Sequence, residues 1–158
     1  PDIMGCGKAA GGGILPISFV AGRNDVIGTL TPGSEGSTFG GYPLASVVGV
    51  FAIKSLIDEK LTYNAKIRGE QLMQHFNDIK NDFPDKIMEV RGRGLLTAFE
   101  MFDSKHLDGH KVSVELLNNG IYAKETHHST VRIAPSLTVT AVHIDQMAQG
   151  IRNVVANL

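Results

Sequence analysis

The stretch Gly5-Cys6-Gly7-Lys8-Ala9-Ala10-Gly11-Gly12-Gly13 combines one lysine with eight small residues. Glycine suits places where the backbone takes a positive φ or comes close to a ligand. The apolar residues Ile3 to Cys6 lead into it, and we expect them to form a strand. Small neighbours would leave room for the lysine amine to be held at a cofactor. From this segment alone, however, a surface lysine in a flexible loop is the better explanation.

The lysine does not belong to a phosphate-binding P-loop. That motif needs a glycine five residues before Gly7 and a serine or threonine after the lysine. Asp2 and Ala9 stand at these positions. The sequence therefore gives no support to ATP binding.

The residues around this segment are also rich in glycine, with twelve of the eighteen glycines in the first 50 residues. We therefore expect short strands, at Ile3 to Cys6 and Ile17 to Ala21, joined by tight loops. From Pro43, which suits a first helical turn, the spacing of apolar residues predicts a helix with one buried face. These apolar residues are Leu44, Val47, Val48, Phe51 and Leu56.

A second helix is expected after a domain boundary near Leu61, which divides the chain into residues 1–60 and 61–158. Thr62 is a candidate cap for this helix, and Asn81 to Asp85 contain the residues that stop it. Its apolar stripe consists of Leu72, Phe76 and Ile79.

The rest of the chain alternates between strand and helix patterns, which predicts a small α/β layer. The expected strands are residues 87–90, 95–102, 121–124 and 131–134, with a turn at 91–94. One helix should end near Asn118 to Gly120, and a last helix should begin at the cap Thr140. The apolar face of the last helix is expected to contain Ile144, Met147, Ile151, Val154, Val155 and Leu158.

The stretch from Gly33 to Pro43 places hydroxyl groups and free backbone N–H groups just before the first helix. Such groups can bind a phosphate by hydrogen bonding without burying a charge. A capped helix entry explains the same residues equally well.

Taken in order, these motifs resemble the class III pyridoxal-phosphate-dependent aminotransferases. The shared motifs are Gly-Lys-Ala at 7–9, Gly-Ser-Thr-Phe-Gly-Gly at 36–41, Val-Arg-Gly-Arg-Gly-Leu-Leu at 90–96, Lys-Glu-Thr-His at 124–127 and Val-Arg-Ile-Ala-Pro at 131–135. Within the class, the chain is most similar to ornithine aminotransferases. The resemblance implies an α/β fold of the aspartate aminotransferase type. Residues 1–60 would be the end of the large cofactor-binding domain with a connecting helix, and residues 61–158 the small C-terminal α/β domain.

The resemblance also implies roles for four residues. Lys8 would form the Schiff base with pyridoxal 5'-phosphate and act as acid and base in turn. Ser37 and Thr38 would bind the phosphate of the cofactor in the neighbouring subunit, so a homodimer is expected. Arg132 would bind a substrate carboxylate, because a guanidinium can grip that group with two hydrogen bonds. Without the resemblance, a salt bridge at a strand edge would be the better explanation of Arg132, and Arg91 and Arg93 are interpreted as structural turn residues.

The expected reaction is amino transfer from the side-chain end of ornithine to 2-oxoglutarate, giving glutamate semialdehyde and glutamate. Acetylornithine or another ω-amino acid is the alternative donor. The chain departs from the usual family pattern at Glu35, Tyr42 and Ser136, where histidine, asparagine and proline are common. A folded fragment or a non-catalytic relative that dimerises is a separate hypothesis, and we expect the 158 residues by themselves to be inactive.

The composition excludes some other functions. The net charge is -1 with both signs mixed, so no basic surface is expected to bind nucleic acid or an anionic membrane. The longest apolar run, residues 44–53, is too short to span a bilayer. A single cysteine, Cys6, and no recognisable leader lead us to expect a cytoplasmic protein. His106 with His110, and His127 with His128, lack the ligands that would complete a metal site, so no metal is expected.

Overall fold

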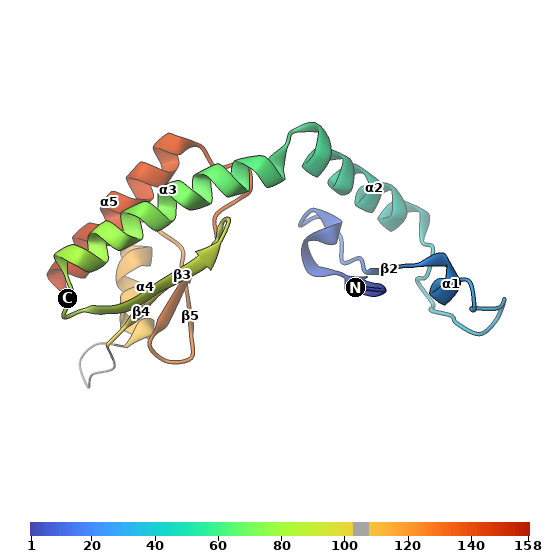
Figure 1. Cartoon of the computed structure of the whole chain (residues 1–158), viewed down its shortest axis with the longest axis horizontal. Coiled ribbons are helices and arrows are strands. Elements are labelled where there is room, and N and C mark those ends of the chain that lie inside the picture. Colours follow the sequence, from blue (N-terminus) through green and yellow to red (C-terminus); the bar gives the residue numbers. More distant parts are fainter. Residues whose placement is uncertain (103–107) are drawn as a thin grey trace. The chain divides into compact units, whose positions relative to one another are not determined.

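The computed structural model describes residues 1–102 and 108–158, which form two compact units. Unit 1 is Pro1–Lys60 and unit 2 is Leu61–Leu158. Both units are drawn in Figure 1. They are described separately below.

Unit 1 contains a two-stranded antiparallel sheet, a 3-10 helix, a single-turn helix and one long helix. Strand β1 (Ile3–Cys6) pairs with β2 (Phe19–Gly22), and the 3-10 helix η1 (Lys8–Gly11) follows β1 directly. A single-turn helix α1 (Asn24–Ile27) follows β2, and the long helix α2 (Pro43–Asp58) completes the unit. The predicted strand at Ile3–Cys6 and the predicted helix start at Pro43 are confirmed. The second strand begins two residues later than predicted.

Helix α2 packs against the segment around η1 through one glycine. A Cβ atom on Gly49 would lie 2.6 Å from Ile17 Cδ1, and one on Gly11 would lie 2.8 Å from Ile17 Cγ2. Ile17 therefore fills the space between the two glycines. This contact positions the segment that carries Lys8 against α2.

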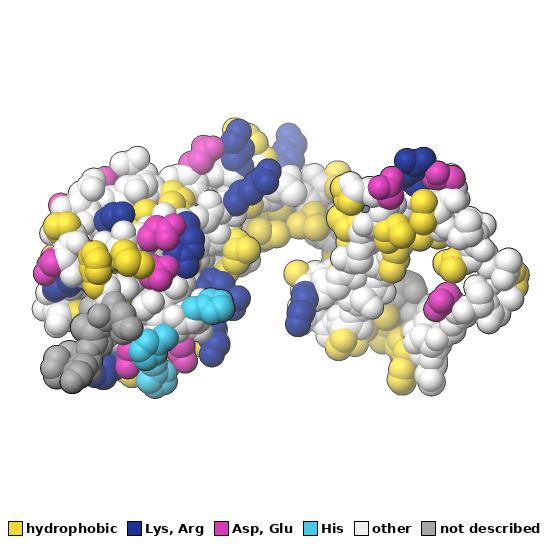
Figure 2. Space-filling view, turned by 60° about the horizontal axis from the view of Figure 1, so that its bottom comes forward, with side chains coloured by type: hydrophobic (Ala, Val, Ile, Leu, Met, Phe, Trp, Pro, Cys, Tyr) yellow, Lys and Arg dark blue, Asp and Glu magenta, His cyan; other side chains and the backbone are white. Residues whose placement is uncertain are grey.

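The apolar surface of α2 is largely uncovered in unit 1, and the predicted buried face is therefore wrong for this chain. Leu44, Val47 and Phe51 are each more than half exposed, at 53%, 52% and 65%. Hydrophobic side chains are visible on this unit in Figure 2. Only Gly11 and Gly49 are buried in unit 1. The apolar residues do follow helical spacing, but no described residue of unit 1 packs against most of the face that they form.

Unit 2 is a four-stranded antiparallel sheet with helices packed on one face (Figure 1). The strands are β3 (Ile87–Arg93), β4 (Leu96–Met101), β5 (Lys124–Thr126) and β6 (Thr130–Ile133). Their order in the sheet is β3-β4-β6-β5. The helices are α3 (Leu61–Asp82), α4 (Gly109–Asn118) and α5 (Ala141–Asn157).

One hydrophobic core joins these helices to the sheet. Alternate residues of β4 face the helices, and Phe99 packs edge to face on Phe76 of α3 with ring centroids 5.6 Å apart. The predicted stripe of α3 is buried, and so is most of the predicted face of α5. Burying one large apolar side chain is worth about 1.5–3 kcal/mol. The fully buried members are Leu72, Phe76, Ile79, Ile87, Phe99, Met101, Val112, Leu116, Val131, Ile133, Ile144, Ile151 and Val155.

Polar contacts fix the helix ends and the long loop after β6. Thr140 accepts a hydrogen bond from the His143 backbone N–H, so its prediction as the cap of α5 is confirmed. Asn64 of α3 donates to the carbonyls of Leu137 (2.7 Å) and Val139 (2.9 Å). These bonds hold the loop between β6 and α5 against α3.

One close approach between α3 and the turn after β3 is made by backbone alone. A Cβ atom on Gly69 would lie 2.2 Å from the carbonyl oxygen of Gly94. Gly94 has φ +55 and begins the two-residue turn between β3 and β4. Glycine is needed there because other residues rarely adopt this conformation.

Several predicted ends were wrong by a few residues. Thr62 is not a cap, because α3 already begins at Leu61. Strand β3 continues through Arg93, so the turn is only Gly94 and Leu95. Strand β5 begins at Lys124, where the predicted strand ended. Within the described residues, no helix combines the length and the apolar character needed to cross a membrane.

Candidate functional site

Lys8 is the first residue of η1 and has an unusual backbone. Its φ is +54, in the left-handed region, where a residue with a side chain is strained by about 1–3 kcal/mol. The side chain is exposed. Within residues 1–102 and 108–158, no carboxylate or other group is paired with its amine. Backbone strain of this kind clusters at active sites and ligand-binding sites, and Lys60, His127 and His128 also have positive φ.

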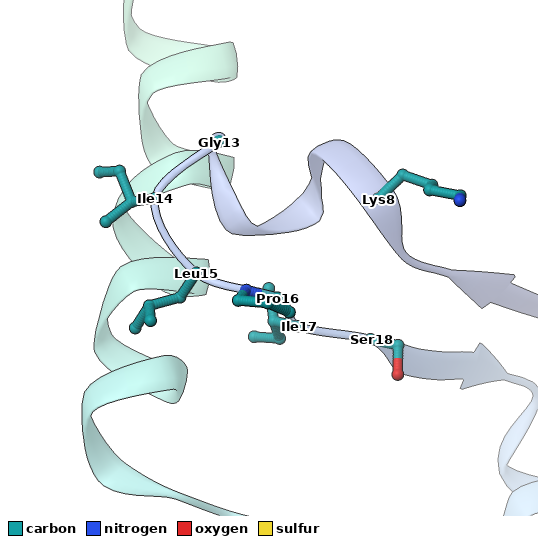
Figure 3. Close-up of a pocket in the computed structure, with 7 residues that line it drawn as sticks. All are labelled: Lys8, Gly13, Ile14, Leu15, Pro16, Ile17 and Ser18. Atoms are coloured by element: carbon teal, nitrogen blue, oxygen red, sulfur yellow. The ribbon is translucent and has the colours of Figure 1, made fainter.

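The Lys8 side chain borders an open cleft of about 710 Å³ within unit 1. Figure 3 shows Lys8 and Ser18 toward one end of this cleft and Ile14 and Leu15 toward the other. The remaining lining residues are Gly13, Pro16 and Ile17. An unpaired amine at the edge of open space leaves room for the attachment of an aldehyde-bearing cofactor.

Ser37 and Thr38 lie in an exposed turn before α2 and do not line the cleft at Lys8. The Gly40 N–H donates to the Ser37 carbonyl within this turn. Helix α2 has Tyr42 at its N-cap and no side-chain capping bond. The capped helix entry that the sequence allowed is therefore not formed.

Two of the three departures from the family pattern lie beside this turn. The Tyr42 ring packs edge to face on Phe39, with ring centroids 6.2 Å apart. Glu35 is exposed and has no ion pair among the described residues. Ser136 lies after β6, where its hydroxyl contacts the Thr138 hydroxyl at 2.8 Å.

Arg132 lies in the middle of β6 on the open face of the sheet, opposite the helices. Its neighbours Val131 and Ile133 point into the core and are buried, whereas Arg132 is exposed. In the described parts of the chain, no carboxylate pairs with its guanidinium. The strand-edge salt bridge that the sequence allowed is therefore not observed there, and the guanidinium is available to an anion.

Arg91 and Arg93 are strand residues and not turn residues, so their interpretation from the sequence is corrected. Arg91 Nη1 contacts Glu89 Oε2 at 2.9 Å and Glu100 Oε2 at 2.6 Å. This pairing raises the pKa of Arg91 and lowers the pKa of Glu100, chiefly through the hydrogen bond between them. Both arginines are in β3 because the turn is shorter than predicted.

His110 and His75 each lie close to a carboxylate. His110 Nδ1 lies 3.4 Å from Glu125 Oε1, and His75 Nε2 lies 2.8 Å from Asp145 Oδ1. The hydrogen bond with His75 is the largest cause of the lowered pKa of Asp145. In the part of the chain that the structure describes, no three metal-binding side chains meet. His106 lies outside the described residues.

Sequence reasoning missed the packing of Ile17 between Gly11 and Gly49, which positions the Lys8 segment. It also missed the alignment of Arg132 with Lys124 on the neighbouring strand, where the two residues are directly paired. Gly11, Ile17 and Gly49 can be read in the sequence, but only the structure shows that they pack together. The alignment required the strand register.

Comparison with known proteins gives the family. The class III aminotransferase family model matches residues 1–155. The ornithine aminotransferase of Arabidopsis thaliana, described as mitochondrial, is 39% identical over 157 residues, which are 98% of this chain and 33% of that protein.

Solved structures agree with this match. An acetylornithine aminotransferase from Elizabethkingia anophelis superposes with a TM-score of 0.93 at 34% identity, over 100% of this chain and 41% of that one. The ornithine aminotransferase from Toxoplasma gondii ME49 gives 0.92 at 39% identity, over 99% and 37%. The predicted fold class is thereby confirmed. The chain spans between about a third and two fifths of the length of these relatives, and it belongs to the class III aminotransferase family.

Proposed function

We propose that the protein containing this chain is a pyridoxal-phosphate-dependent aminotransferase that transfers the side-chain amino group of ornithine to 2-oxoglutarate. The observation that carries the proposal is Lys8 itself. Its amine is exposed, unpaired among the described residues and held by a left-handed backbone beside an open cleft. It occupies the lysine position of the Gly-Lys-Ala motif in a chain that belongs to this family.

Lys8 would hold the cofactor covalently through its amine. When bound, pyridoxal phosphate supplies an aldehyde for this attachment and an electron-withdrawing ring. When its amine is free, Lys8 would act as the base that takes a proton from the substrate carbon carrying the amino group and, once protonated, as the acid that delivers this proton to the cofactor carbon that receives the amino group. Ser37 and Thr38 would donate hydrogen bonds to the phosphate of a partner subunit's cofactor, which requires a homodimer.

Arg132 would bind a substrate carboxylate. A guanidinium with no carboxylate partner in the described chain can donate hydrogen bonds to both oxygens of a carboxylate at once. Replacement by lysine would keep the charge and lose this pair of hydrogen bonds.

We also propose that the protein is cytoplasmic, because its sequence contains a single cysteine. The name of the Arabidopsis relative places that protein in the mitochondrion.

Borohydride reduction of the full-length protein with bound cofactor, followed by peptide mapping, tests the role of Lys8. The reduced cofactor should be found on the peptide that contains Lys8 and should be lost in Lys8→Ala. The matched control is Lys54→Ala, which removes another exposed lysine of unit 1. A cofactor adduct on a different lysine would end the proposal.

A second candidate donor is acetylornithine, because an acetylornithine aminotransferase superposes with a TM-score of 0.93. Rates with ornithine, acetylornithine and 4-aminobutyrate at equal 2-oxoglutarate separate the candidates. Ornithine should be preferred, since three curated relatives that are 39–40% identical to this chain are named ornithine aminotransferases. A wide preference for either other amine would replace ornithine as the assigned donor.

A further inference from the structure

The open face of the sheet in unit 2 carries one row of residues that crosses all four strands. Arg91 of β3 is paired with Ala98 of β4, Ala98 with Arg132 of β6, and Arg132 with Lys124 of β5. Residues directly opposite in antiparallel strands point to the same face. The row therefore presents three cationic side chains, with Ala98 between Arg91 and Arg132 and with Lys124 beside Arg132.

The cations in this row differ in how they are neutralised. Arg91 contacts the carboxylates of Glu89 and Glu100 at 2.9 and 2.6 Å. Arg132 has no carboxylate partner among residues 1–102 and 108–158, and the closest acidic contact of Lys124 is Glu125, at 3.9 Å. Like charges directly opposite each other destabilise a strand pair. The pairing of Arg132 with Lys124 therefore has an electrostatic cost that a bound anion would remove.

Arg132 and Lys124 are both exposed, so an anion in solution can reach them. Ala98 is the other cross-strand neighbour of Arg132, and its side chain is a single methyl group. Lys124 lies on the edge strand with 56% of its side chain exposed, so its flexible stem can move toward Arg132. Two cations about 5 Å apart at Cβ can contact one carboxylate group together.

We propose that Lys124 is a second cationic contact for the substrate carboxylate that Arg132 binds. Arg132 would orient the carboxylate through paired N–H donors, and the Lys124 ammonium would add attraction as a point charge. This inference rests on the proposed function, because it assigns Lys124 to the same carboxylate. It predicts that Lys124 changes substrate affinity with little effect on the turnover of bound substrate.

Steady-state kinetics of the full-length protein test the inference, with KM measured for the amino donor and for 2-oxoglutarate separately. Each KM that Arg132→Gln raises should also rise in Lys124→Gln, by roughly 3- to 10-fold. The kcat should stay within about twofold, and Lys124→Arg should restore most of the affinity because it keeps the charge. Lys66→Gln is the matched control, since Lys66 is an exposed lysine of the same unit on α3.

Calorimetric titration with glutarate, a dicarboxylate without an amino or oxo group, gives a second measurement that needs no turnover. Glutarate should bind more weakly to both Arg132→Gln and Lys124→Gln than to the unchanged protein. An unchanged KM and unchanged glutarate affinity in Lys124→Gln, beside a clear loss in Arg132→Gln, overturns the inference and leaves the proposed function standing. Glutarate binding that depends on Lys124 in a protein that transaminates no amine would instead refute the proposed function and keep the anion site.

Discussion

The contact between Arg91 and Glu100 shows how one ion pair contributes to unit 2. Arg91 Nη1 lies 2.6 Å from Glu100 Oε2, and the Glu100 side chain is only 21% exposed. The hydrogen bond from Arg91 is the largest cause of the lowered pKa of Glu100. Because the folded pKa lies below the unfolded one, the pair stabilises the fold above the ordinary glutamate pKa of about 4.3.

The stabilisation from Glu100 should therefore disappear as the pH falls from about 4.3 through the folded pKa. Glu100→Gln should lower the free energy of unfolding at pH 7 by about 0.5–1 kcal/mol, with a smaller difference at pH 3. Urea denaturation of the chain at several pH values measures this. Glu70→Gln, at an exposed position of α3, is the control and should show no such pH-dependent difference. A loss at pH 3 as large as at pH 7 would contradict the role of the charge.

At the scale of elements, the packing of α2 on the Lys8 segment depends on Gly49 and Ile17. The Cβ of an added side chain at position 49 would meet the flexible end of Ile17 at 2.6 Å. Alanine can be accepted if Ile17 changes rotamer, and it also favours a helix over glycine by about 0.5–1 kcal/mol. A branched side chain cannot be placed without moving the segment.

Gly49→Val should therefore destabilise the full-length protein by about 1–3 kcal/mol and weaken cofactor binding. Gly49→Ala should have a much smaller effect. Combining Gly49→Val with Ile17→Ala should cost less than the sum of the two single changes, because the smaller residue makes room for valine. Thermal unfolding and cofactor titration of the four variants measure the coupling. Strict additivity would show that the two residues do not share this space.

The elements themselves were largely predictable, because helices and strands follow local rules. The stripe Leu72, Phe76 and Ile79 identified α3, and Thr140 identified the start of α5. The ends of the helices and strands were predicted less accurately where the conformation of a turn determines them. Gly94 begins a two-residue turn, so β3 extends to Arg93 and the expected four-residue turn does not exist.

The candidate site was predictable only in part. The motifs singled out Lys8, Ser37, Thr38 and Arg132, and their assigned roles stay predictions. The unpaired state of Arg132 and its alignment with Lys124 could not be predicted, because strand register depends on pairing between distant parts of the chain.

At the scale of the whole molecule, the two units differ in how much core they contain. Unit 2 has one contiguous set of buried apolar side chains, whereas the described residues of unit 1 bury only two glycines. Helix α2 instead exposes Val50 (56%), Phe51 (65%) and Ile57 (69%). Stability within a protein follows buried contacts. Unit 2 should therefore be the more stable part of the chain.

Hydrogen exchange of the 158-residue chain measures this difference. Amides of β4, β6 and α5 should exchange slowly, and those of β1, β2 and α2 should exchange at rates close to those of an unfolded peptide. The same chain should bind pyridoxal phosphate poorly and should not transaminate ornithine. Equal protection of both units would contradict this prediction. Strong cofactor binding by the isolated chain would contradict it as well.

The contact between Gly69 and Gly94 has a consequence for how unit 2 can vary. The main chains of α3 and the β3-β4 turn touch with no side chain between them, and a Cβ atom at position 69 would lie 2.2 Å from the Gly94 carbonyl oxygen. No choice of rotamer can relieve a clash that begins at Cβ. The spacing of this helix from its hairpin is therefore set by two main chains, and a hydrogen atom is the largest substituent that position 69 tolerates while they remain in place.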